Sequence, residues 1–285
     1  MTDTTVVDLS FVPYVFLYVS NLDEARVYFG DWLGFHAIEE DPFCSKYDAG
    51  RTLIALNEIP GLPQTVDAGS MLRMHTGDDL AWHAEIADRG VDVAPDASSW
   101  EIDSPYGHRI GGFEPHPDTR VPVARRVDDI VANRRERAGG RALGRHPVVS
   151  IVQFVTHPAT AREFYSDALG LTIAEEHPED GATIYDCGSL LLEIRALDDV
   201  VGDDNAVVPR LSTVFEVSDC LGAVRALIER GVHFPTAPRR GPIGLTASFS
   251  DPDGHSYYLY EPSIDALSWP SGAFMRAGNF ATGSR

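Results

Sequence analysis

The chain has 285 residues, 44% of them apolar, which is long enough to bury the core of two domains or of one domain with a duplicated plan. Its formal net charge of −20 would repel phosphate backbones and anionic lipids, so we expect neither nucleic acid nor a membrane surface as partner. The first thirty residues lack a signal-peptide pattern, and no apolar run approaches the roughly 20 residues that span a bilayer, so the sequence predicts a cytoplasmic protein.

The first half of the chain begins with a strand and an amphipathic helix. Residues 14–35 read YVFLYVSNLDEARVYFGDWLGF, with apolar residues at helical spacing and Gly34 placed for a left-handed cap. Residues 78–93 predict a second helix, closed by Arg-Gly-Val and followed by a strand. Residues 103–115 predict a proline-containing turn with Gly and His, which leads into a strand ending in Glu-Pro.

A linker and a repeat of these patterns follow. Residues 116–147 are rich in Arg and broken by Gly and Pro, which predicts a linker with one short helix. Its arginines either bind an anion or nucleic acid or, as we favour, form a solvated face packed against the acidic domains. The segments 150–171, 219–234 and 251–262 then repeat, in the same order, the three patterns of the first half. The chain therefore reads as four βαβββ modules, and no element is predicted from Ser263 onward.

The cysteines argue against a cysteine-based site. Cys44, Cys187 and Cys220 are odd in number, widely spaced and without a CxxC pair. This pattern disfavours a disulfide framework and a thiolate zinc site, so we expect three reduced cysteines.

The order of the modules, the helix ends in Leu-Gly and the Asp-Pro-Asp-Gly turn resemble the vicinal oxygen chelate superfamily, which includes glyoxalase I, extradiol dioxygenases, and bleomycin and fosfomycin resistance proteins. The resemblance implies an α+β fold in which the four modules pair into two glyoxalase-like domains, with curved, barrel-like mixed sheets around a cleft. It divides the chain into an N-terminal domain (11–115), the linker (116–147), a C-terminal domain (148–262) and a tail (263–285). Which modules pair is left open.

The resemblance also points to the positions of metal ligands. In metal-binding members, ligands come from the first and fourth strands of a module and from matching strands of its partner. The matching residues here are Ser150, Glu193, Ser212 and Tyr258 in the second half, and Tyr14, Ala55, Met71 and Gly111 in the first. Glu193 alone is a good ligand for a divalent metal, so we predict no metal and no other cofactor. Histidines outside these positions, such as His108 and His255, are expected in turn hydrogen bonds, although a metal site built from unaligned histidines stays open.

Strand alternation predicts which side chains face the two clefts. An aromatic surface with a few convergent polar groups is typical of a small-molecule site. The first half contributes Tyr14, Phe16, Tyr18, Arg73, His75 and Arg109, and the second half contributes Ser150, Phe154, Glu193, Arg195, Ser212, Glu216, Ser256, Tyr258 and Tyr260.

We expect Ser150, Glu193, Ser212 and Tyr258 to converge around one hollow that holds an organic molecule and no ion. Glu193 is the candidate general acid or base, with Tyr258 and Ser212 holding or protonating a substrate oxygen. The alternative is a structural pair of Glu193 with Arg195 on the face of a strand.

Glu193 and the tyrosines favour a metal-independent enzyme acting by isomerisation, cyclisation, elimination or hydrolysis on an oxygenated, aromatic or polyketide-like small molecule. The resemblance implies secondary metabolism as its setting. A binder without catalysis, similar to drug-sequestering resistance proteins, is the alternative. A metal-dependent glyoxalase or dioxygenase with unconventional ligands is the second alternative. The expected partner is a small molecule, and whether the chain forms a homodimer stays open.

Overall fold

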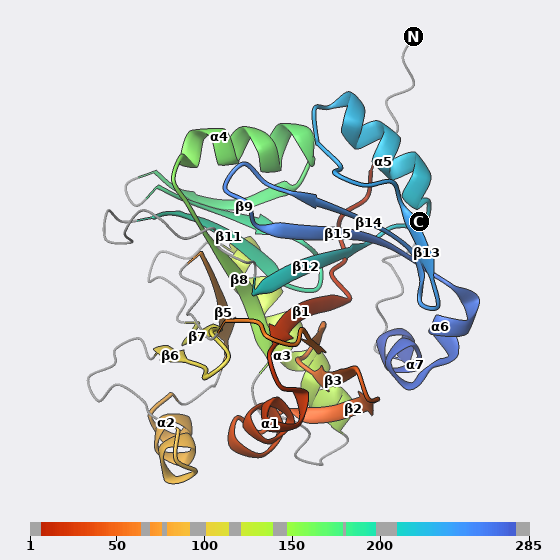
Figure 1. Cartoon of the computed structure of the whole chain (residues 1–285). Coiled ribbons are helices and arrows are strands. Elements are labelled where there is room, and N and C mark those ends of the chain that lie inside the picture. Colours follow the sequence, from red (N-terminus) through yellow and green to blue (C-terminus); the bar gives the residue numbers. More distant parts are fainter. Residues whose placement is uncertain are drawn as a thin grey trace.

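The structure of the protein is a computed structural model that describes residues 7–63, 69–75, 79–91, 101–113, 121–138, 147–178, 181–197 and 210–277. Within these residues the strands form two mixed sheets, of eight and seven strands, and helices flank the sheets (Figure 1). The α+β fold expected from the sequence is confirmed.

The eight-stranded sheet has the order β13-β14-β15-β12-β1-β4-β3-β2, so it is open, with β13 and β2 at its edges. Its strands are β1 (Tyr14–Val19), β2 (His36–Glu40), β3 (Cys44–Asp48), β4 (Leu53–Glu58), β12 (Leu211–Glu216), β13 (Arg239–Gly241), β14 (Gly244–Ser250) and β15 (Ser256–Pro262).

The seven-stranded sheet has the order β6-β7-β5-β8-β11-β10-β9 and is also open. Its strands are β5 (Ser70–Met74), β6 (Glu101–Asp103), β7 (Arg109–Gly112), β8 (Val148–Val155), β9 (Thr172–His177), β10 (Ala182–Asp186) and β11 (Leu191–Ala196). The helices are α1 (Leu22–Arg26), α2 (Asp79–Asp88), α3 (Val121–Ala138), α4 (Pro158–Arg162), α5 (Cys220–Glu229), α6 (Ile264–Ser268) and α7 (Pro270–Ala277), and α1 and α4 continue as π-helical stretches over Val27–Trp32 and Glu163–Ala168.

The sheets answer the question of module pairing that the sequence leaves open. The first module pairs with the fourth, because β1 runs antiparallel to β12 with Tyr14 opposite Val214. The second module pairs with the third through β5 and β8, with Leu72 opposite Ile151. Each sheet therefore combines strands from both halves of the sequence and does not follow the division into successive halves.

Local chemistry explains the repeated helices that open the first and third modules. Asn21 caps α1 by accepting a hydrogen bond from the backbone N–H of Glu24 at 3.2 Å. Both helices end before a glycine with positive φ, Gly34 at 79° and Gly170 at 75°, a conformation that costs glycine little.

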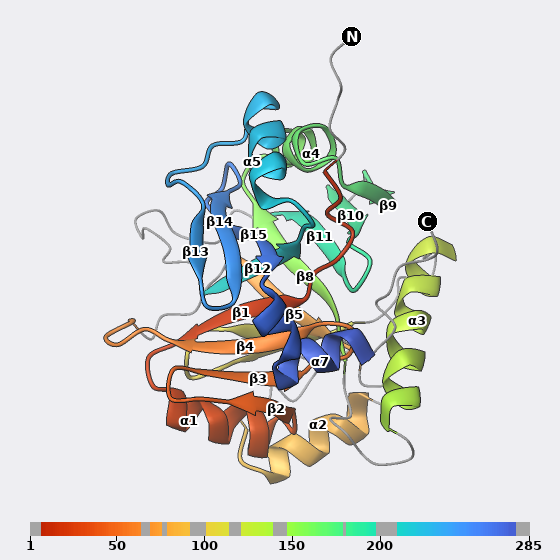
Figure 2. The ribbon, with the colours of Figure 1, turned by 90° about the vertical axis from the view of Figure 1, so that its right-hand side faces the viewer.

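The linker contains a longer helix than expected. Instead of one short helix, α3 spans 18 residues, and its apolar side packs Val123 and Val127 against Ile184 and other residues of the seven-stranded sheet. Arg126 donates from two nitrogens to the two carboxylate oxygens of Asp186, at 2.8 and 2.7 Å (Figure 2 shows α3 along the side of the molecule). One linker arginine thus forms an ion pair with an aspartate of the C-terminal domain. Apart from α3 and Pro147, the linker residues 116–147 lie outside the described residues.

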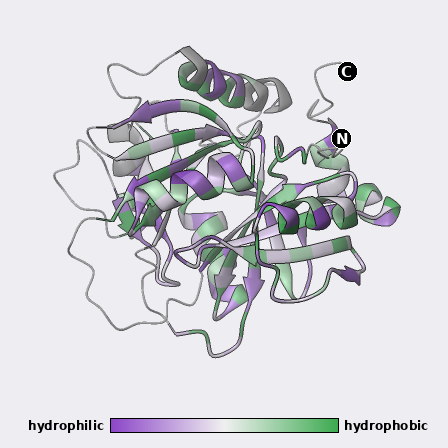
Figure 3. Cartoon of the chain, turned by 90° about the horizontal axis from the view of Figure 1, so that it is seen from above, coloured by the Kyte–Doolittle hydropathy of each residue, from purple (hydrophilic) through white to green (hydrophobic). Residues whose placement is uncertain are grey.

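The segment after Ser263 also differs from expectation, since it forms α6 and α7. Ser263 caps α6 through its hydroxyl, which accepts from the N–H of Ala266 at 3.1 Å. In Figure 3 hydrophilic and hydrophobic residues mix along the helices, as expected where one side of a helix is buried. None of the helices in the described ranges has the length and apolarity of a membrane-spanning helix.

A buried polar cluster joins the third and fourth modules at the Asp-Pro-Asp-Gly-His turn. The Asp251 carboxylate accepts hydrogen bonds from the Tyr165 hydroxyl at 2.6 Å and contacts Nδ1 of His255 at 2.7 Å. The other ring nitrogen of His255 lies 2.9 Å from the carbonyl oxygen of Gly69, just before β5. This turn therefore contacts elements of both sheets.

The matching turn of the second module replaces the carboxylate by a hydroxyl. Ser104 Oγ lies 3.2 Å from Nδ1 of His108 and accepts from the His108 N–H at 3.0 Å. Burial lowers the pKa of His108 to about 3, so this imidazole is neutral at pH 7. Both histidines make turn hydrogen bonds, the role expected for them.

Asp251→Asn should lower the free energy of unfolding by about 2 kcal/mol, because the charge that accepts from Tyr165 and pairs with His255 is lost inside the protein. Ser104→Ala, the matched change in the repeat, should cost about 1 kcal/mol, since it removes neutral hydrogen bonds only. Urea unfolding of both variants measures the difference, and equal losses would contradict the role given to the Asp251 charge.

The Asp251 contribution should also depend on pH. Burial raises the pKa of Asp251, but hydrogen bonds and charge from His255 and a hydrogen bond from Tyr165 outweigh burial and lower it below its ordinary value of 3.8. A lowered folded-state pKa gives stability that is present above the ordinary value and is lost as pH falls through the folded value. Urea unfolding below pH 3.8 should therefore show a steeper loss for the wild type than for Asp251→Asn.

Candidate functional site

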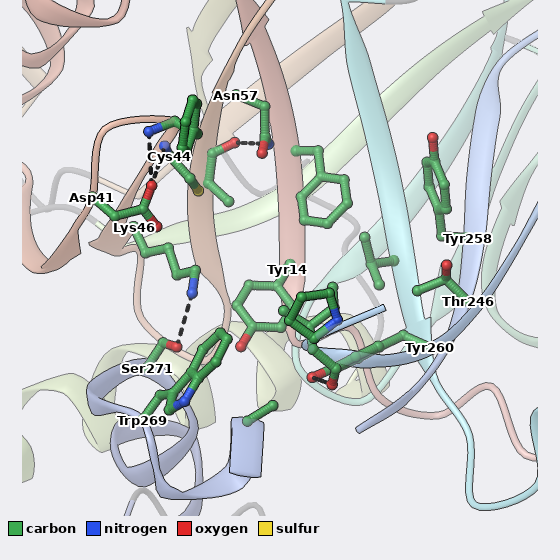
Figure 4. Close-up of a pocket in the computed structure, with 17 residues that line it drawn as sticks. Tyr14, Asp41, Cys44, Lys46, Asn57, Thr246, Tyr258, Tyr260, Trp269 and Ser271 are labelled. Atoms are coloured by element: carbon green, nitrogen blue, oxygen red, sulfur yellow. Dashed lines mark hydrogen bonds between the residues drawn. The ribbon is translucent and has the colours of Figure 1, made fainter. Parts of the chain in front are cut away.

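The eight-stranded sheet carries a cavity of about 300 Å³ on the face where β1, β12 and β15 meet (Figure 4). Side chains of these strands form its floor, and the segment from α6 to α7 forms one wall with Trp269 and Ser271. The cavity therefore combines the first module, the fourth module and the C-terminal helices.

The floor is aromatic because alternate residues of a strand point to the same face. Tyr14 and Phe16 of β1 lie beside Tyr260 and Tyr258 of β15, with ring centroids 5.9 Å apart for Tyr14 and Tyr260 and 5.7 Å apart for Phe16 and Tyr258. The Tyr260 hydroxyl donates to the carbonyl of Ile243 at 3.0 Å, which orients this ring. These four predicted residues are brought together by the structure.

A chain of hydroxyl groups continues this floor along β1. The Tyr18 hydroxyl lies 3.1 Å from Ser212 Oγ and donates to the Tyr258 hydroxyl at 3.5 Å. Burial, and then the neighbouring Tyr258, raise the pKa of Tyr18 well above its ordinary value. Ser256 lies opposite Ser212 in the parallel pairing of β12 with β15. Tyr18 therefore stays protonated at pH 7 as a hydrogen-bond donor.

One end of the cavity is polar. Lys46 Nζ lies 2.7 Å from Glu39 Oε1, donates to Ser271 Oγ at 3.2 Å, and lies 5.5 Å from the ring centre of Trp269. The N–H of Ser271 donates to the other Glu39 oxygen at 3.0 Å, so the segment between α6 and α7 is bound to β2 and β3. Burial raises the pKa of Tyr14 to about 12, although a hydrogen bond with Ser271 opposes this shift.

Sequence analysis missed Lys46, Trp269 and Ser271 as site residues. Lys46 is the only lysine of the chain, and it alternates with Cys44 on the face of β3 that lines the cavity. That strand alternation was the signal available for Lys46. Trp269 and Ser271 carry no comparable signal, because they follow no periodic pattern.

Of the other predicted residues, Glu216 ends β12 of the eight-stranded sheet, and the rest lie on or directly after strands of the seven-stranded sheet. Glu193, whose side chain is 1% exposed, accepts from Ser150 Oγ at 2.8 Å and from Arg195 Nε at 3.1 Å, and Arg73 NH1 lies at 3.5 Å. This arrangement is the structural ion pair of Glu193 with Arg195 that the sequence analysis gave as the alternative to catalysis, with Arg73 as a second basic partner. Ser150 and Glu193 are thus separated from Ser212 and Tyr258, which lie on the other sheet, so the structure does not bring the expected four together.

The remaining three predicted residues, Arg109, Phe154 and His75, belong to neighbouring strands or directly follow one. Arg109 of β7 lies 3.5 Å from Asp103, and Phe154 of β8 lies beside Arg195 in the sheet. His75 follows β5 and donates its backbone N–H to Pro147 at 2.9 Å. The same face of β10 and β11 is covered further along by α3, which packs on Ile184, the residue opposite Glu193.

The residues at the expected ligand positions do not fit a catalytic metal. In the eight-stranded sheet these positions hold Tyr14, Ala55, Ser212 and Tyr258, and in the seven-stranded sheet they hold Met71, Gly111, Ser150 and Glu193. The one carboxylate among them is held by two guanidinium groups, whose charge opposes binding of a cation. Across the described ranges, no three His, Cys, Asp or Glu side chains form a group that could hold a metal ion.

Comparison with known proteins agrees with this architecture. Residues 148–257 match the model of the Glyoxalase/Bleomycin resistance protein/Dioxygenase superfamily. The structure is similar to glyoxalase I from Zea mays, with a TM-score of 0.63 and 14% identity over 96% of this chain and 97% of that chain. It is also similar to a "putative dioxygenase" from Bacillus subtilis subsp. subtilis str. 168, with a TM-score of 0.64 and 12% identity over 92% of this chain and 88% of that chain.

No curated protein matches the sequence. At identities of 12 and 14%, the likeness to the two solved structures shows the fold. The expected resemblance is confirmed over residues 148–257, which match the model of this superfamily, and the chain as a whole has a fold similar to that of the two solved structures.

Proposed function

We propose that the cavity of the eight-stranded sheet binds an aromatic, oxygen-bearing small molecule and does so without a metal ion. The observation that carries this proposal is the aromatic floor of Tyr14, Phe16, Tyr258 and Tyr260, closed on one side by Trp269. Flat aromatic faces bury a large area of a ring-shaped ligand at little cost in side-chain entropy.

The size of the cavity supports a small ligand. A volume of about 300 Å³ lies at the lower end of the range for small-molecule sites and accommodates a molecule of two or three fused rings. The surface of the cavity is mostly apolar, which is typical of sites where aromatic surface supplies affinity and hydroxyl groups fix orientation.

The hydroxyl groups favour a ligand that carries oxygen. Because burial raises the pKa of Tyr14 to about 12, Tyr14 is protonated at pH 7, and its hydroxyl can donate a hydrogen bond to a carbonyl, ether or hydroxyl oxygen. A buried donor that finds an acceptor on the ligand discriminates strongly against analogues lacking that oxygen.

A metal-independent enzyme is the second candidate. The chain of hydroxyls from Tyr18 through Ser212 and Tyr258 favours it, because such a chain could hold or protonate a substrate oxygen during isomerisation, cyclisation, elimination or hydrolysis. Glu193 was the expected acid or base, but its ion pairs with Arg73 and Arg195 on the other sheet support a structural role. For this reason we place binding, as in a drug-sequestering protein, before catalysis.

Trp269→Ala should weaken binding of 2-naphthylmethanol, a neutral aromatic alcohol, at least about tenfold, because it removes one wall of the cavity. Trp32→Ala is the matched control, since Trp32 lies on the first module outside the cavity and is 38% exposed. Isothermal titration calorimetry measures both affinities, with and without EDTA. Binding that disappears with EDTA, or that Trp32→Ala weakens equally, would contradict the proposed site.

Glu193→Gln should lower the free energy of unfolding by about 2 kcal/mol, because an amide cannot satisfy two guanidinium groups as a carboxylate does. The same variant should bind 2-naphthylmethanol like the wild type, since Glu193 lies on the other sheet. Urea unfolding and calorimetry test the two halves of this prediction. A large loss of affinity in a folded Glu193→Gln protein would return Glu193 to the ligand site.

A further inference from the structure

The carboxylate of Glu216 lies at the end of the aromatic floor. Within the part of the chain that the structure describes, it takes part in no ion pair and in no hydrogen-bonded turn. Glu216 lies two residues beyond Val214 on β12 and opposite Tyr260 in the pairing with β15, so it is next to two residues that line the cavity. Its side chain is partly buried, and among the described residues it has no hydrogen-bond or ion-pair partner. A partly buried carboxylate in this state has lost water without gaining a counter-charge.

The contrast with Glu39, the other carboxylate near this end of the cavity, shows what Glu216 lacks. Burial raises the pKa of Glu39, but hydrogen bonds from Lys46 and Ser271 outweigh burial and lower it. Burial alone acts on Glu216, and its pKa is raised. Lys46 is engaged by Glu39 at 2.7 Å, so this ammonium group already has a partner other than Glu216.

The charges that act on Tyr14 show the sign of the potential at this end of the cavity. After burial and the Ser271 hydrogen bond, the pKa of Tyr14 is raised further by Glu39, Glu216 and Cys44. Glu216 likewise raises the pKa of Tyr260. Asp41 adds a further negative charge to the lining, and its carboxylate accepts hydrogen bonds from the backbone N–H groups of Phe43 and Cys44 at 2.7 and 2.9 Å.

We propose that the ligand of this cavity is an organic cation: an aromatic or otherwise flat molecule with a protonated amine, which pairs with Glu216 between the rings of Tyr14 and Tyr260. This inference rests on the proposed function and names its ligand class. A cation gains from the faces of aromatic rings and from an unpaired carboxylate at once, whereas an anion meets repulsion from Glu216. The net charge of −20 also favours cationic ligands, because it raises their concentration near the protein.

The test compares three probes of one shape and different charge: 2-naphthylmethylamine, which is an ammonium ion at pH 7.5, neutral 2-naphthylmethanol, and anionic 2-naphthoate. Calorimetry at low salt should show the amine binding to the wild type about tenfold more tightly than the alcohol, and the naphthoate more weakly than both. Glu216→Gln keeps the size of the side chain and removes its charge. It should reduce the preference for the amine to less than about threefold while leaving the affinity for the alcohol unchanged.

Glu58→Gln is the matched control. Glu58 ends β4 of the same sheet, is exposed and does not line the cavity, so this substitution removes an equal charge outside the cavity. It should keep the full preference for the amine, and thermal unfolding should show that both variants are folded.

Equal affinity for the amine and the alcohol in the wild type, or an unchanged preference in Glu216→Gln, would overturn the cation class while leaving the proposed binding function in place. If Glu58→Gln lowered the preference for the amine as much as Glu216→Gln does, the preference would come from the net charge of the protein, and the role of Glu216 would be overturned. Absence of binding by all three probes would overturn the cation class and the proposed function together.

Discussion

The antiparallel contact between β1 and β12 is the interaction on which the site depends. It joins the first module to the fourth with Tyr14 opposite Val214 and Phe16 opposite Ser212. Because β12 also pairs with β15, this register places the aromatic residues of β1 on the same face as Tyr258 and Tyr260 of β15. A shift of one residue would turn every one of these rings to the opposite face of the sheet.

Duplication has produced two equivalent faces with different contents. Ala55 in the eight-stranded sheet holds the position that Glu193 holds in the other, and Ala55 and its strand neighbour Phe16 both line the cavity. On the seven-stranded sheet, the charge of Glu193 is matched by arginines, and α3 packs along the same face. On one sheet the charge of Glu193 is thus neutralised by arginines, whereas the matching face of the other sheet carries the cavity.

The parts of this structure that could be predicted from sequence depend on local chemistry. Strand alternation, the helix ends at Gly34 and Gly170, and the Gly-His turns need only a short stretch of chain, and four aromatic residues of the floor follow from alternation alone. Module pairing could not be predicted, because similar modules offer similar strand edges. The grouping of Glu193 with Tyr258 failed for this reason, since it assumed that modules adjacent in sequence share one sheet.

The wall formed by the C-terminal helices escaped prediction for a different reason. The helices α6 and α7 have five and eight residues, which is too short for a clear hydrophobic period. Their position is set by long-range contacts, such as the one from the Ser271 N–H to Glu39, more than 200 residues earlier in the chain. Contacts of this kind leave no pattern within a window of sequence.

Because Lys46 is the sole lysine of the chain and lines the cavity, the only lysine side-chain amine of the protein lies at the cavity. Amine-directed acylating reagents therefore have two targets, this side chain and the terminal amino group. The rate of Lys46 acylation therefore measures how well Trp269 and Ser271 shield its amine. A molecule bound in the cavity would slow the acylation of the one peptide that contains Lys46, which mass spectrometry can detect.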